Sequence, residues 1–139
     1  MLAMTSYPEV YVQLTAAKVE EQHAAYAALA KSAQGTAAEQ ALTAFASEYF
    51  ATALLALDHH FMHRMRGMEG KDGNALNEVR MLSDSIMEHG GVLQENKTMK
   101  YRSDKAIAGI AIGQKIVLDA ATFERLAKAY LEEIGKRFP

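Results

Sequence analysis

The side chains most able to do chemistry lie in one stretch of the chain, residues 58–80, with the sequence DHHFMHRMRGMEGKDGNALNEVR. On a helix, with about 100° between neighbours, His59, His63 and Arg66 would share one face. Two imidazoles four residues apart can reach one metal ion, but a third ligand would have to come from elsewhere, and Arg66 would repel the cation. Three hypotheses remain for this face: a solvated or partner-facing surface, an anion or ligand pocket, and a metal site at His59 and His63.

A turn interrupts this stretch at residues 70–74, and a further helix should follow it. Free amides at the start of a helix favour negative groups, and the neighbouring lysine and arginines would add charge. The spacing fits neither a P-loop nor a dinucleotide-binding loop, so an ordinary capped turn is the alternative. A Glu69–Arg80 pair or a Glu78–Arg66 pair could tie the turn to the preceding helix. The residues predicted to bind an anion or a partner are His59, His60, His63, Arg64, Arg66, Lys71, Asn74, Asn77 and Arg80.

His23 stands apart from this stretch. It falls on the apolar seam predicted for the first helix, where a histidine is usually buried and hydrogen-bonded. A polar residue in such a seam can also pair with a facing helix and fix the register of packing. We expect a structural role for His23, with ligand binding as the alternative.

A short basic cluster lies farther along the chain, at Lys97, Lys100, Arg102 and Lys105, with Tyr101 among the cations. Such side chains can hold phosphates, and an aromatic ring can stack on a base. Acidic neighbours dilute the cluster, however, and lysines also protect exposed strand edges. Nucleic-acid binding is therefore the less favoured interpretation.

The composition excludes several classes of protein. The 139 residues include no cysteine, which removes disulfides, thiolate zinc sites, iron–sulfur clusters and a cysteine nucleophile. The formal net charge of -2 gives no general attraction to nucleic acid or to an acidic membrane. No serine lies in a nucleophile elbow, and no apolar run has the length of a membrane span. We expect a cytoplasmic protein, favour a non-catalytic role, and expect no cofactor unless the histidines hold a metal.

Two long helices should precede and carry the histidine-rich stretch. Capping boxes mark two helix starts, at Ser6 with Glu9 and at Thr36 with Glu39. Gly35 separates the two helices, since glycine readily ends a helix. The first helix has an apolar seam, and the apolar stripe of the second continues until about Gly67 or Gly70. The two should pack as an antiparallel hairpin over residues 7–67.

Three further elements are expected. Asn74 can cap a third helix, which should end at a pair of glycines. Apolar residues alternate on either side of a glycine–glutamine pair near residues 107–118, which predicts a small β-hairpin. Asp119 then caps a C-terminal helix. The expected fold class is mostly α, α+β at most: one domain, residues 1–139, built as a helical bundle with a long N-terminal helical hairpin.

Two segments of the second half resemble a group of uncharacterised bacterial proteins of similar length. One runs from residue 60 to residue 80, with EGKDGN followed by LNEVR, and the other is the ending IGQKIVLDAATFERLAKAYLEEIGKRF. The resemblance spans about residues 60–138. It implies that the block 60–80 is a unit, and it implies no activity, cofactor or catalytic residue.

Together these patterns predict a non-catalytic binding or interaction domain with a polar His/Arg face around residues 59–80. Apolar surface left over on the hairpin favours a homodimer. The alternatives are a metal- or anion-binding protein that uses the same face, and a weak nucleic-acid binder that uses residues 97–105. The expected partners are a second copy, a small anion or another protein, and no membrane.

Overall fold

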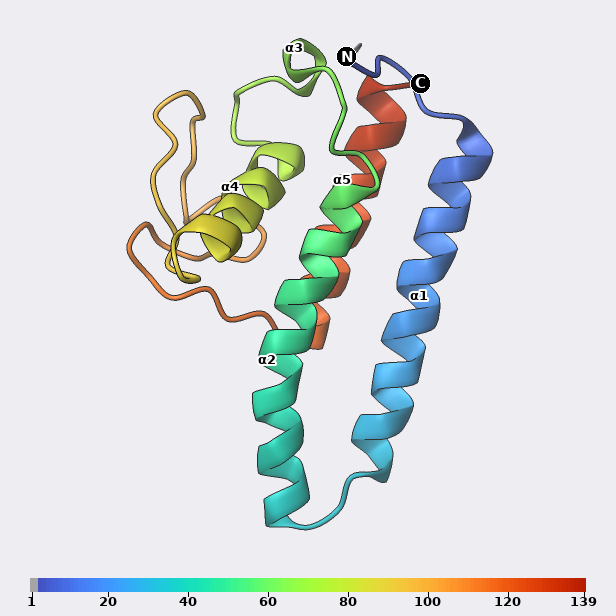
Figure 1. The fold of residues 1–139 in the computed structure, drawn as a ribbon, viewed down its shortest axis with the longest axis vertical. Coiled ribbons are helices and arrows are strands. Elements are labelled where there is room, and N and C mark those ends of the chain that lie inside the picture. Colours follow the sequence, from blue (N-terminus) through green and yellow to red (C-terminus); the bar gives the residue numbers. More distant parts are fainter. Residues whose placement is uncertain (1–2) are drawn as a thin grey trace.

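Helices make up most of the computed structural model, which describes residues 3–139 (Figure 1). In this range they are α1 (Glu9–Ser32), α2 (Thr36–His59), α3 (Arg66–Glu69), α4 (Ala75–Glu88) and α5 (Ala120–Arg137). The mostly-α prediction is confirmed. None of the helices in this range combines the length and the apolarity that a bilayer crossing requires.

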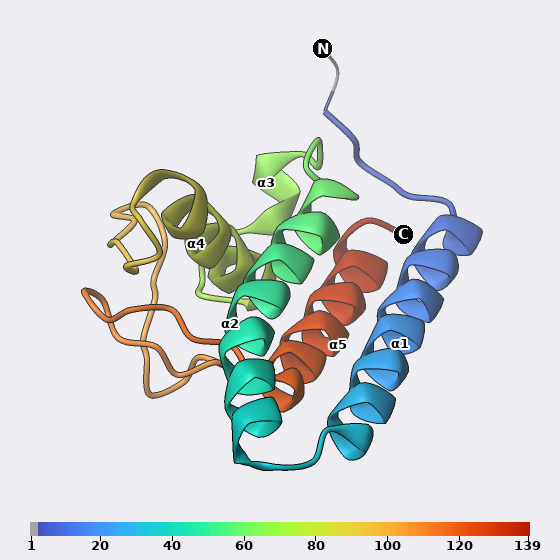
Figure 2. The same ribbon diagram turned by 60° about the horizontal axis from the view of Figure 1, so that its bottom comes forward.

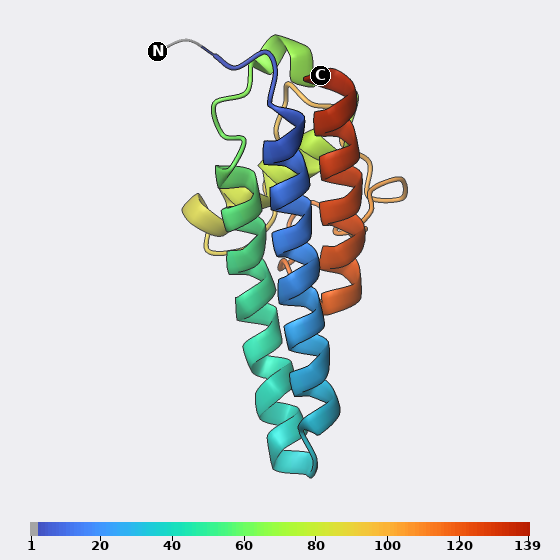
Figure 3. The same ribbon diagram turned by 90° about the vertical axis from the view of Figure 1, so that its right-hand side faces the viewer.

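Three of the helices lie side by side, and the fourth long one crosses them. Figures 2 and 3 both show α1 beside α5, with α2 completing the group. The helix α4 packs against α2 and α5, on the side away from α1 (Figure 1). Residues 89–119 connect α4 to α5 without a regular element.

The core lies where α2, α4 and α5 meet. Its largest fully buried apolar side chains are Phe50, Leu54, Phe61, Leu76, Leu82, Leu93, Leu118, Phe123, Leu126, Tyr130, Ile134 and Phe138. Burying each such side chain stabilises the fold by about 1.5–3 kcal/mol before entropy is counted. Residues that precede α1 close one end of this core, because the Tyr7 ring packs edge-on against Phe61 at 4.9 Å between centroids.

The α1–α2 hairpin projects beyond the rest of the molecule (Figure 1). The helix α5 begins near the level of Phe50, whose ring centroid lies 5.4 Å from that of Phe123. From residue 27 to residue 45 no side chain is buried. Leu29 and Phe45 are 51% and 53% exposed in this part, which we call the hairpin tip.

The second helix ends at His59, earlier than its apolar stripe predicted. Beyond it the backbone pairs with the N-terminal segment: the Met4 N–H donates to the His63 carbonyl, and the Met65 N–H donates to the Met4 carbonyl, both at 2.8 Å. Arg64, between these two, turns inward and is 3% exposed. The prediction of a helix to residue 67 or beyond is wrong, because backbone pairing and a buried arginine replace its last turns.

The predicted β-hairpin is also wrong: residues 107–118 contain no strand. The turn exists, since the Gln114 N–H donates to the Ala111 carbonyl at 3.0 Å. The residues around it pair with Leu93 instead of with each other. Leu93 accepts from the Gly113 N–H at 2.7 Å and donates to the Gln114 carbonyl at 3.0 Å. The alternating apolar residues therefore belong to a segment that pairs with Leu93, earlier in the chain, and not to the two strands of a hairpin.

Candidate functional site

The stretch 58–80 folds around the short helix α3, at the end of the molecule where α1 begins and α5 ends (Figure 1). Several of its polar residues contact one another beneath the surface. We call them, together with one tyrosine of α5, the inner network: the buried Arg64, Glu69, Asn77 and Tyr130 and the half-buried Asp58 and Arg80.

Glu69 is the centre of the inner network. Its side chain is 1% exposed and accepts from Arg80 Nη2 at 2.7 Å and from Arg80 Nε at 3.0 Å. Asn77 Nδ2 donates to the same carboxylate at 3.3 Å. The predicted Glu69–Arg80 pair is therefore confirmed, and it joins α3 to α4.

Arg64 supplies the second cation of the network. Its Nη1 donates to Asp58 at 2.9 Å and to the Tyr130 hydroxyl at 3.1 Å, and that hydroxyl donates to Asp58 at 3.0 Å. Arg64 Nε lies 3.2 Å from a Glu69 oxygen, close enough for an ion pair but at an angle unsuited to a hydrogen bond. A guanidinium thus bridges two carboxylates away from water.

These contacts fix the protonation of the network. Burial alone would raise the pKa of Glu69, but the hydrogen bond from Arg80 and the charges of Arg64 and Arg80 hold it below its ordinary value. Burial, and next the charge of Asp58, raise the pKa of Tyr130 far above its ordinary value. The network therefore holds α3 in place with fixed charges, and neither group changes its charge near neutral pH.

A groove of about 260 Å³ lies on the outer side of α3, and we call it the anion groove. Its lining residues are Arg66, Gly67, Glu69, Gly70, Lys71, Thr98 and Met99. The Lys100 N–H donates to the Lys71 carbonyl at 2.9 Å, which holds the two walls together. Gly73 allows this close approach: its φ is +87°, and a Cβ there would lie 2.2 Å from the Lys100 carbonyl oxygen.

Two cations of the anion groove are available for a ligand. Arg66 and Lys71 are exposed, and within residues 3–139 neither has an ion-pair partner. The groove's own carboxylate, Glu69, is already neutralised by Arg64 and Arg80. The local charge is therefore positive, although the whole chain is slightly acidic.

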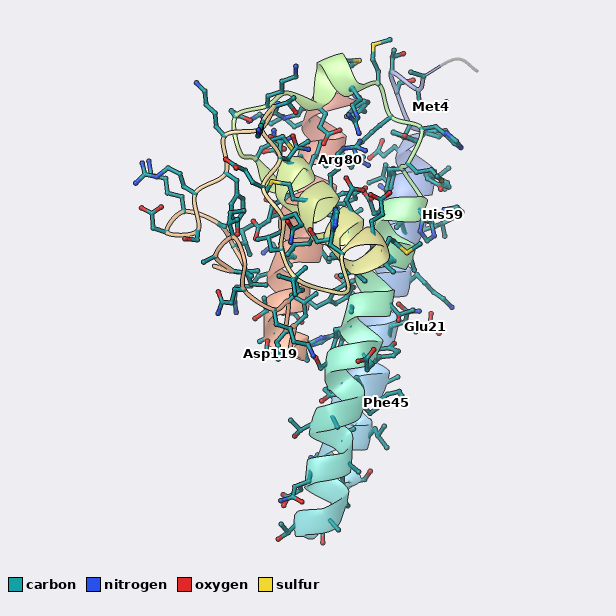
Figure 4. The ribbon with its side chains drawn as sticks, turned by 60° about the vertical axis from the view of Figure 1, so that its left-hand side comes forward. Met4, Glu21, Phe45, His59, Arg80 and Asp119 are labelled. Carbon is teal, nitrogen blue, oxygen red and sulfur yellow. The ribbon has the colours of Figure 1, made fainter. Side chains whose placement is uncertain are left out.

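The three predicted histidines are exposed and lie away from this groove. His60 and His63 line a separate hollow of about 290 Å³ together with Tyr7 and Tyr11. Figure 4 shows His59 at the end of α2, apart from Arg80 on α4. Because α2 ends at His59, the helical spacing of the proposed metal pair does not exist. In the described part of the chain, no three His, Asp or Glu side chains form a group able to hold a metal ion.

The predicted asparagines shape the turn instead of facing a ligand. Asn74 accepts from the Leu76 N–H at 2.8 Å and donates to the Glu69 carbonyl at 2.8 Å. Asn77 accepts from the Gly73 N–H at 2.9 Å and donates to the Gly70 carbonyl at 3.0 Å. The capped-turn interpretation holds for both residues, and their contacts give the anion groove its form.

Sequence reasoning missed two parts of this region. Thr98 and Met99 form a wall of the anion groove, and no local pattern distinguished them. The second is the contact of Glu78, on α4: it was predicted as a possible partner of Arg66, but it is buried and accepts from the Ile107 and Ala108 N–H groups at 2.9 and 2.8 Å. Burial raises its pKa, while these two hydrogen bonds act against that rise. The sequence signal for this contact was the position of Glu78 among the apolar residues of the third predicted helix.

No protein-family model matches the chain, and comparisons with curated proteins and with solved structures find no significant match. The resemblance described for the second half therefore stays a prediction.

Proposed function

We propose that this chain is a non-catalytic binding domain that takes an anionic group of its partner into the anion groove. One observation supports this proposal above all: Arg66 and Lys71 are exposed, and within residues 3–139 neither forms an ion pair. Both residues line walls of the groove that the backbone hydrogen bond between Lys100 and Lys71 holds together. Fixed walls matter because a site that is already ordered loses less entropy on binding.

The size of the groove favours a small group on a larger partner. Its volume of about 260 Å³ is below the usual range of about 300–1,000 Å³ for sites that enclose a drug-sized molecule. A phosphate or a carboxylate is a group of this size, and guanidinium and ammonium groups both donate charge-assisted hydrogen bonds to such anions. The fixed charges of Glu69 and its arginines favour recognition over proton transfer.

An NMR titration with inorganic phosphate tests this proposal. We expect amide shifts confined to residues 66–71 and 98–100, and weaker binding in Arg66→Met and Lys71→Met. Each loss should be about two- to fivefold, the usual worth of one partly exposed charge pair. Lys31→Met, in the last turn of α1 at the hairpin tip, is the matched control and should leave affinity unchanged.

Three outcomes would count against the anion groove. They are amide shifts confined to other parts of the surface, a loss of phosphate affinity in Lys31→Met equal to that in the groove variants, and no amide shift on addition of phosphate. Salt-sensitive binding of generic RNA or DNA that survives Lys71→Met would instead point to the basic cluster at residues 97–105.

We further propose that the chain self-associates through the α1–α2 hairpin. Val10 and Leu14 on α1 and Leu29 and Phe45 at the hairpin tip are large apolar side chains left exposed. Exposed apolar side chains at both ends of a helical hairpin can be covered by a second copy, and an isologous dimer is the commonest such assembly. Sedimentation should show a dimer that Phe45→Glu dissociates, whereas Val117→Glu, on an exposed loop position, should not. A monomer at micromolar concentration would contradict this proposal.

A further inference from the structure

A hollow lies between α1 and α5, far from the anion groove. It has a volume of about 600 Å³, and we call it the α1–α5 groove. Figures 2 and 3 show the two helices side by side along this edge. The volume falls within the range of about 300–1,000 Å³ that is usual for small-molecule sites.

The floor of the α1–α5 groove is apolar. It consists of Ala16 and Val19 from α1 and of Ala127 and Leu131 from α5. Three of these side chains are half-buried, and Ala127 is buried. The small alanines leave space between the helices, so an apolar body could replace water there with a gain in free energy.

The rim of the groove is acidic. Glu20 on α1 and Glu124 and Glu132 on α5 surround the apolar floor, against one cation, Lys128. Lys128 lies one helical turn from each α5 glutamate, so it offsets part of their charge. The remaining negative charge favours a cationic ligand.

His23 and Glu124 fix the spacing of the two helices at one end. His23 Nε2 lies 2.7 Å from a Glu124 carboxylate oxygen. This is the register-fixing pair expected for a polar seam residue, but its partner is on α5 and not on the second helix. The contact occupies Glu124, so Glu20 and Glu132 are the carboxylates left for a ligand.

The length of the groove indicates which kind of ligand it can hold, a small molecule or a helix of a partner. The lining residues run from Ala16 to His23 on α1 and from Glu124 to Glu132 on α5, which is about 10–12 Å along either helix. A partner helix needs several turns of contact to be held. A single small ligand covers this length.

We propose that the α1–α5 groove binds a small organic cation: an ammonium group held by Glu20 and Glu132, with an apolar body on the floor of Ala16, Val19, Ala127 and Leu131. The chemistry is that of an amine carrying an aromatic or a short aliphatic group. This site is independent of the anion groove and does not depend on the function proposed there.

The test compares three soluble probes of one shape: phenethylammonium, the neutral phenethyl alcohol and the anionic phenylacetate. NMR titration of the full chain should show phenethylammonium shifting amides of α1 and α5 around the groove, with about tenfold higher affinity than the alcohol. Phenylacetate should bind most weakly. Equal affinity for all three probes, shifts outside the groove, or no shift with phenethylammonium up to its solubility would overturn the proposal.

Variants of the chain test separately the contribution of the carboxylate charges and that of the apolar floor to binding. The double variant Glu20→Gln/Glu132→Gln should weaken phenethylammonium about tenfold while leaving the alcohol unchanged. Glu21→Gln is the matched control, because Glu21 is the neighbouring carboxylate on α1 but does not line the groove. Ala16→Leu should fill the floor and reduce binding of both probes, with the urea midpoint confirming that the chain is folded. Weakening by Glu21→Gln equal to that of the double variant would overturn the assignment.

Discussion

The guanidinium of Arg80 approaches the carboxylate of Glu69 with Nη2 2.7 Å from Oε2 and Nε 3.0 Å from Oε1. Arg80 belongs to α4, which is part of the core, whereas Glu69 belongs to the four-residue helix α3. A helix this short cannot hold its own position in water. This pair therefore fastens one wall of the anion groove to the core.

Removing Arg80 should destabilise the fold strongly. We expect Arg80→Met to lower the free energy of unfolding by about 3 kcal/mol, because it leaves the buried Glu69 carboxylate with Arg64 as its remaining cation. Arg102→Met is the matched control: its ion pair with Asp104 is well exposed, so it should change stability by less than about 1 kcal/mol. Urea unfolding measures both, and equal effects would contradict the role of the inner network.

Acid should weaken the contribution of Glu69. Its folded-state pKa lies below the ordinary value of 4.5, so its stabilisation is complete above that pH and is lost as the pH falls through the folded-state pKa. The difference in unfolding free energy between the parent and Glu69→Gln should therefore shrink on acidification. Urea unfolding from neutral pH down to pH about 3 measures this difference. A difference that stays constant would exclude a depressed pKa.

Glu78 should behave in the opposite way. Burial raises its folded-state pKa above 4.5, so its contribution is largest below that pH and declines as the pH rises through the folded-state pKa. The free-energy difference between the parent and Glu78→Gln should therefore decrease with increasing pH over the same series. Hydrogen exchange at Ile107 and Ala108 checks the contact, because both amides should exchange faster in Glu78→Ala. Unchanged exchange would show that Glu78 does not hold this loop.

Gly73 and Gly67 offer a matched pair of substitutions beside the anion groove. Gly73→Ala should cost at least about 1–3 kcal/mol and weaken phosphate binding, because φ is +87° and the new Cβ would meet the Lys100 carbonyl at 2.2 Å. Gly67→Ala, in α3, meets no atom within 4 Å and should leave stability equal or slightly higher. Urea unfolding and the phosphate titration measure both variants. Equal tolerance would mean that the walls are not joined at this point.

Local signals predicted some helix starts well and others poorly. Asn74 and Asp119 cap α4 and α5 through their side chains, as expected. The two predicted capping boxes do not form: Pro8 and Gly35 are the N-caps of α1 and α2, and neither has a side-chain hydrogen bond. The predicted starts were still within two residues. Composition and periodicity therefore located these helices better than they described their ends.

The site was predictable only in part, because its walls come from distant segments. Arg66 and Lys71 were among the candidates, but the Lys100–Lys71 hydrogen bond that joins them to residues 98–100 depends on tertiary packing. Arg64 was expected to bind an anion or a partner. Its place inside the inner network depends on a hydrogen bond to Tyr130, which lies 66 residues later in the chain. No local sequence pattern predicts a contact between residues so far apart.

The projecting hairpin has a consequence for the dynamics of α1 and α2. Near the core these helices carry buried side chains such as Leu54, whereas residues 27–45 bury none. Their alanines favour the helix, but with no buried side chain the hairpin tip has little tertiary packing to prevent fraying. Amides near Leu54 should therefore exchange their hydrogens only when the whole domain unfolds, whereas those near Gly35 should exchange by local opening. The single helix α2 would then cover the full range of opening free energies, from local fraying to global unfolding.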